Sequence, residues 1–113
     1  IQNVLTSNWN YFERIDEMNK AKVNQIFEKL SGQSSERLQI FIADACRNVP
    51  SMLKPGTEDS TQAAYLTAAV AYLDYLKIRK QISVANAVTD TEIIFAEKLL
   101  NSFKEAFSEI IKA

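Results

Sequence analysis

Apolar residues recur at spacings of three and four along most of the chain, which is the period of an amphipathic α-helix. The most regular stretch is C-terminal, where one seam comprises Ile93, Ala96, Leu100, Phe103, Phe107 and Ile110. Strand signals are weak, because the two short β-like runs lie inside or beside a helical pattern. The pattern therefore predicts an all-α fold without a sheet.

Turn and capping residues divide this pattern into four parts. Gly32 stands where a left-handed C-cap would end a first helix. Pro55 and Gly56 suit the centre of a tight turn, and Thr89 with Glu92 has the spacing of a capping box. We expect a single domain over the whole chain, with four helices over residues 6–31, 35–48, 58–81 and 90–112.

The first two predicted helices each have an apolar side, which we expect to face the core. In the first helix the apolar positions are Trp9, Phe12, Ile15, Met18, Val23, Ile26 and Leu30. In the second they are Leu38, Phe41, Ile42, Ala45 and Val49.

The third predicted helix is apolar over a wide arc. Only a strip with Thr67, Ala71, Asp74 and Ile78 remains for water or for a partner. Because so wide an arc needs neighbours on at least two sides, we expect a small four-helix bundle with this helix as its most buried member. Its longest apolar run is well short of the roughly 18 to 20 residues that a membrane span requires, so no span is expected.

Charge and composition argue against several classes of function. The chain has 13 Lys and Arg against 14 Asp and Glu, so it lacks the overall positive field that non-specific nucleic-acid binding needs. It has no histidine, which removes the commonest general base and metal ligand. The single cysteine, Cys46, is expected to be a small buried residue in a reducing, cytoplasmic compartment. Since the sequence begins at Ile1, we expect a processed chain or a piece of a longer one.

One compact basic cluster ends the third helix and carries Lys77, Arg79 and Lys80. Two interpretations are open. The cations complete the C-terminal end of the helix dipole, or they contact phosphate groups or an acidic partner. No glycine-rich loop, RNA-binding signature or zinc spacing accompanies the cluster, so the second interpretation rests on charge alone.

Four further residues are candidates for a protein interface. Tyr75 and Ile78 lie at the edge of the wide apolar arc of the third helix. Phe107 and Ile110 lie in the last two turns of the fourth, where a terminal helix can extend past its neighbours. Each of the four is equally suited to core packing, so the pattern leaves both roles open.

No catalytic, cofactor-binding or metal-binding pattern accompanies these features, and we do not expect an enzyme. The composition and the helices favour a non-enzymatic interaction module or a small subunit of a larger protein assembly, with a second copy of the chain as one candidate partner. Two alternatives stay open. One is a helical subunit of a nucleoprotein complex that uses the basic cluster, and the other is a bundle that encloses an apolar ligand.

Overall fold

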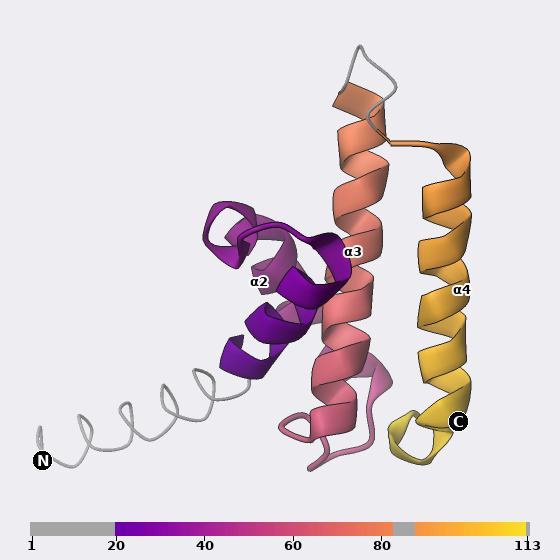
Figure 1. Cartoon of the computed structure of the whole chain (residues 1–113). Helices are drawn as coiled ribbons and strands as arrows, with labels where there is room; N and C mark the ends of the chain where they lie inside the picture. The colour runs from indigo at the N-terminus through magenta and orange to yellow at the C-terminus, as the bar shows by residue number, and fades with distance from the viewer. Residues whose placement is uncertain (1–19, 83–87, 113) are drawn as a thin grey trace, which may run out of the picture.

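The computed structural model describes residues 20–82 and 88–112, and it confirms the all-α prediction (Figure 1). Residues 20–31 are helical, and the helices α2 (Gln39–Asn48), α3 (Thr61–Ile82) and α4 (Asp90–Ala106) follow. Short 3-10 turns are η1 (Ser35–Leu38), η2 (Val49–Met52) and η3 (Ser108–Ile110). The predicted apolar positions Trp9, Phe12, Ile15 and Met18 lie outside the described residues.

The long helix α3 runs between the N-terminal helices and α4, and it divides the core into two clusters (Figure 1). Residues 20–31 and α2 pack on its alanines in a cluster of Val23, Ile26, Phe27, Ile42, Ala45, Ala64, Ala68 and Ala71. The cluster on the α4 side comprises Val49, Leu53, Ala63, Leu66, Ala69, Leu73, Leu76, Val88, Ala96 and Leu100. As predicted, this helix buries more residues than any other described helix.

Local capping chemistry fixes where the helices start and stop. Gly32 has a φ of 69°, the left-handed conformation that a C-cap glycine adopts without strain. The Ser60 hydroxyl accepts a hydrogen bond from the Ala63 amide at 3.1 Å and caps α3. At the start of α4 the Thr89 hydroxyl accepts from the Glu92 amide, and the Glu92 carboxylate accepts from the Thr89 amide. This reciprocal pair is the predicted capping box.

Several helix bounds differ from the predicted ones. The second helix opens as the 3-10 turn η1 and becomes α-helical only at Gln39. The third starts at Thr61, because the serine before it supplies the cap. The fourth ends at Ala106, where Phe107 leaves the helical conformation with a φ of −109° and a ψ of 26°.

The strip expected to remain open on α3 is only partly open. Thr67 is 4% exposed. Ala71 is fully buried, because residues 20–31 and α2 pack against it. Further along, Asp74 is half-buried and Ile78 is exposed. The open part of the strip is therefore confined to the C-terminal half of α3.

Residues 110–112, which follow α4, fold back onto the segment that follows α2. Leu53 and Ile111 form an isolated antiparallel bridge. Beside it, the Lys54 amide donates to the Ile110 carbonyl at 2.7 Å, and the Lys112 amide donates to the Met52 carbonyl at 3.0 Å. Residues 110–112 are thus tied to the segment after α2 instead of extending past it.

The apolar sides of the described helices pack into the two core clusters. Over residues 20–82 and 88–112, none of the helices combines the length and the apolar character that crossing a bilayer requires.

Candidate functional site

The lysines of the predicted basic cluster face acidic residues on α4. The Lys77 ammonium lies 4.0 Å from the Glu97 carboxylate, and Lys80 forms an ion pair with Asp90. These two pairs join the C-terminal end of α3 to the N-terminal half of α4. Since all four side chains are largely accessible to water, each pair stabilises the fold by only about 0–1 kcal/mol. Contact of the cluster with phosphate stays a prediction.

The third cation, Arg79, is held by Tyr75. Its guanidinium donates a hydrogen bond to the Tyr75 hydroxyl at 2.8 Å and lies 5.8 Å from the centre of the ring. The Tyr75 ring in turn meets Phe27 and Phe41 edge-on, at centroid distances of 6.1 and 5.7 Å. Tyr75 therefore belongs to the packing between the N-terminal helices and α3, and only its accessible edge is open to a partner.

Beside this packing, a groove of about 490 Å³ lies between the start of α2 and the C-terminal half of α3. We call it the Ile78 groove. It is lined by Ile40, Phe41, Asp44, Asp74, Lys77, Ile78 and Gln81. Ile40 is 69% exposed and Ile78 is 42% exposed, so two large aliphatic side chains contact water on its walls. The volume falls in the range of roughly 300–1,000 Å³ that is usual for small-molecule binding sites.

Negative charge predominates in the Ile78 groove. Asp74 is half-buried, and loss of hydration raises the pKa of its carboxyl group above the ordinary value. The charge of Asp44 raises that pKa further, whereas Lys77 lowers it. Asp44 is paired with Arg47 at 2.7 Å, but no ion pair to Asp74 occurs among the described residues. The carboxylate of Asp74 is therefore only partly balanced by positive charge, and a cation that entered the groove would balance the rest.

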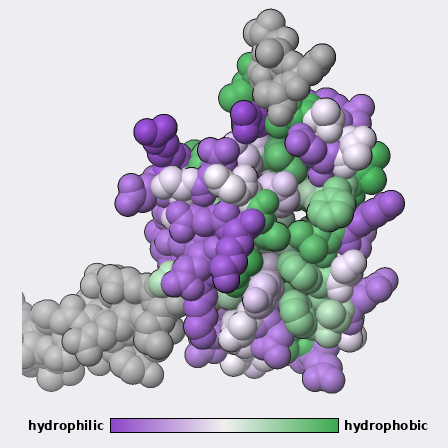
Figure 2. All heavy atoms as spheres, in the orientation of Figure 1, coloured by the Kyte–Doolittle hydropathy of each residue, from purple (hydrophilic) through white to green (hydrophobic). Residues whose placement is uncertain are grey.

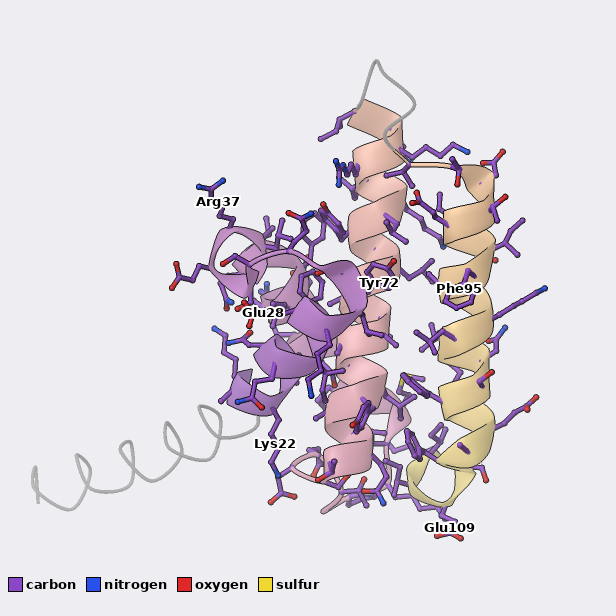
Figure 3. The ribbon with its side chains drawn as sticks, in the orientation of Figure 1. Lys22, Glu28, Arg37, Tyr72, Phe95 and Glu109 are labelled. Carbon is purple, nitrogen blue, oxygen red and sulfur yellow. The ribbon has the colours of Figure 1, made fainter. Side chains whose placement is uncertain are left out.

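A second apolar surface covers the near face of α3 and α4, the face turned toward the viewer in the figures. Figure 2 shows hydrophobic residues gathered along these two helices, with hydrophilic residues over the N-terminal helices beside them. Tyr72 and Phe95 both lie on this face (Figure 3). Burial raises the pKa of the Tyr72 hydroxyl, and the nearby charge of Glu92 raises it further, which places Tyr72 close to the first turn of α4.

Near the C-terminal end of α4, aromatic rings join this helix to the first turns of α3. The Tyr65 ring lies 5.7 Å from that of Phe103 and 6.3 Å from that of Phe107, and these two phenylalanines stack at 5.7 Å. Phe107 and Ile110 are half-buried and pack against the core cluster on the α4 side. Contact of Phe107 and Ile110 with a partner stays a prediction, because each retains some accessible surface.

Four exposed large apolar side chains were not identified from the sequence, namely Ile40, Ile82, Ile94 and Phe95, and two of them matter for the surfaces described above. Ile40 lines the Ile78 groove, and Phe95 is 65% exposed on the near face of α4. Each lies off the periodic apolar face of its own helix. A large apolar residue at a position that the helical period assigns to solvent is a signal for an interface, and it was available in the sequence.

The described residues offer little for chemistry on a substrate. No group of three or more histidine, cysteine, aspartate or glutamate side chains among them is arranged to hold a metal ion. Cys46 is half-buried, not fully buried as expected, and it packs against the cluster formed by residues 20–31, α2 and α3. No protein-family model, no curated protein and no solved structure matches the chain, so the surfaces of the molecule carry the functional argument.

Proposed function

We propose that this chain is a non-enzymatic interaction module, or a small subunit of a larger assembly, that binds a protein partner in the Ile78 groove. The observation that carries the proposal is the exposure of Ile40 and Ile78 on the walls of a groove that also holds the half-buried carboxylate of Asp74, which has no ion pair among residues 20–82 and 88–112. Large exposed apolar side chains rimmed by polar residues are typical of sites that another protein covers.

The groove supplies both affinity and orientation. Covering an aliphatic side chain completely is worth about 1.5–3 kcal/mol relative to leaving it in water, and Ile40 and Ile78 each have part of that surface still accessible. Charged groups add specificity more than strength, because a cation matched to Asp74 would fix the register of a bound segment. The proposed mechanism is therefore burial of apolar surface, guided by one acidic position.

The two alternative functions have less support. For nucleic acid, Lys77 and Lys80 already face acidic residues on α4, so phosphate contacts would compete with existing pairs. For an enclosed apolar ligand, the Ile78 groove is unsuitable because Asp44, Asp74 and Lys77 line it.

The native mass of the protein purified from its natural source tests the proposal. We expect the wild-type chain in a complex heavier than one chain, and we expect Ile78→Asp to release it while leaving the helical circular dichroism spectrum intact. Gln62→Asp introduces the same charge at an exposed position in the first turn of α3, outside the groove lining, and serves as the matched control. Retention of the full complex by Ile78→Asp would contradict the proposal.

A further inference from the structure

Phe95 is the most exposed aromatic side chain among the described residues. It lies on the near face of α4, as Figure 3 shows. Lys98 follows it by three residues, a spacing that places two side chains on the same side of a helix. Lys98 is exposed, and the described residues provide it with no ion pair. The helix therefore presents an apolar side chain with a free cation beside it.

The Ile78 groove has the complementary properties. Its exposed isoleucines offer apolar surface, and its charged residues are Asp44, Asp74 and Lys77, which sum to one negative charge. The ammonium of Lys77 approaches Glu97 on α4, and Asp44 is paired with its neighbour on α2. A second cation that reached Asp74 would add to the partial compensation that this carboxylate receives from Lys77.

These two surfaces lie on opposite faces of the molecule and do not meet within one chain. Tyr72 and Phe95 share the near face (Figure 3). Asp74 follows Tyr72 by two residues, which is a rotation of about 200° around α3. The groove that Asp74 lines accordingly opens away from the face that carries Phe95.

We infer that the Ile78 groove binds Phe95 and Lys98 of a second copy of this chain, so that α4 of one molecule docks between α2 and α3 of the next. This inference rests on the proposed function, because it names the partner of the same groove. Different surfaces of the two copies meet, so every pair retains one free groove and one free Phe95. Such a heterologous contact builds an open chain or a closed ring. Because little more than one helix face is buried, the association is weak and reversible.

Complementary loss-of-contact variants test this arrangement. In sedimentation equilibrium, the average mass of the wild-type chain should rise above 12.8 kDa as the concentration increases from about 10 µM to about 1 mM. Phe95→Asp and Ile78→Asp should each be monomeric over this range, because each variant lacks one half of the contact. Mixed together they should form a complex of two chains and no larger species, since one intact groove and one intact Phe95 remain. Gln62→Asp, in the first turn of α3 and outside both surfaces, should associate like the wild type.

Charge reversal provides a second test, which does not depend on the apolar residues. Asp74→Lys and Lys98→Asp should each weaken association by about threefold to tenfold, and the double variant should recover most of the loss. Circular dichroism checks that each variant keeps its helices.

Three results would overturn the inference: a wild-type chain that stays monomeric at the highest concentration, a mixture that does not associate, or single variants that associate normally. A monomeric wild type whose native complex is nevertheless released by Ile78→Asp would place a different protein in the groove. The proposed function would then stand while the second copy is excluded. A native complex that Ile78→Asp leaves intact would instead remove the proposed function.

Discussion

Replacing Phe27 with alanine should separate the N-terminal helices from α3. Phe27 is fully buried in the cluster that residues 20–31 and α2 form on the alanines of α3, and its ring meets Tyr75 edge-on. The alanines opposite it, such as Ala64 and Ala68, have no side-chain freedom to fill the space. The substitution therefore leaves a cavity in addition to removing buried apolar surface.

The expected cost is about 3–5 kcal/mol in the free energy of unfolding, the usual range for phenylalanine to alanine in a core. The free energy of unfolding of a small domain is about 5–15 kcal/mol in total. The variant would therefore be markedly less stable than the wild type, and at the low end of this range it would barely fold. At about 4–8 °C per kcal/mol, the melting temperature should fall by more than about 12 °C. Phe95→Ala is the matched control, because it removes the same atoms from a side chain that is 65% exposed. It should cost less than about 0.5 kcal/mol.

Urea denaturation at about 10 µM, followed by circular dichroism, measures both variants at a concentration where weak association contributes little. Equal losses from Phe27→Ala and Phe95→Ala would refute the reasoning, since burial is the only large difference between the two positions. A loss at Phe27 below about 1 kcal/mol would also refute it. That result would mean that the cluster of residues 20–31, α2 and α3 is not a packed core.

Three further predictions concern single groups. Thr89→Ala should cost about 1 kcal/mol in urea denaturation because it removes the capping hydroxyl of α4, and a loss no larger than that of the exposed neighbour Thr91→Ala would contradict it. The pKa of Asp74 is raised in the folded chain, so the folded state binds more protons between the ordinary and the raised value, and stability falls as the pH rises through that window. Asp74→Asn should accordingly gain stability relative to the wild type between about pH 3 and pH 7, and a difference that does not change with pH would be contrary evidence. Lys80→Gln should cost less than about 1 kcal/mol at low salt and nothing measurable in about 1 M NaCl, and a loss that persists in high salt would show that Lys80 does more than pair with Asp90.

Features set by neighbouring residues were predictable from the sequence. The capping box at Thr89 and Glu92 and the left-handed Gly32 depend on the chemistry of a few consecutive positions. The apolar seam of α4 was predictable for the same reason, because helical period alone decides which side chains share a face. Phe27 fits the same period as Val23 and Leu30, so its burial could also have been predicted.

Features set by distant residues were not predictable in this way. Helical projection gives the apolar arc of α3 but not which part of it a neighbour in the same chain covers. Thr67 and Ala71 were therefore left for water or for a partner, although both are buried and Ala71 packs in the cluster with residues 20–31 and α2. The bridge between Leu53 and Ile111 joins positions far apart in the chain, and no local sequence pattern predicts it. The Ile78 groove likewise exists only because α2 and α3 pack together.

Photo-crosslinking from inside the Ile78 groove tests the central claim most directly. p-Benzoylphenylalanine placed at Ile40, which is 69% exposed on the groove wall, reports what lies in the groove when the protein is irradiated in its natural source. The same group at the exposed Gln62, in the first turn of α3 and outside the groove lining, is the control position. We expect one predominant adduct from position 40, either with a second copy or with one other protein, that Ile78→Asp abolishes and that position 62 does not produce. The absence of an adduct at position 40, or the same adducts from both positions, would contradict the claim.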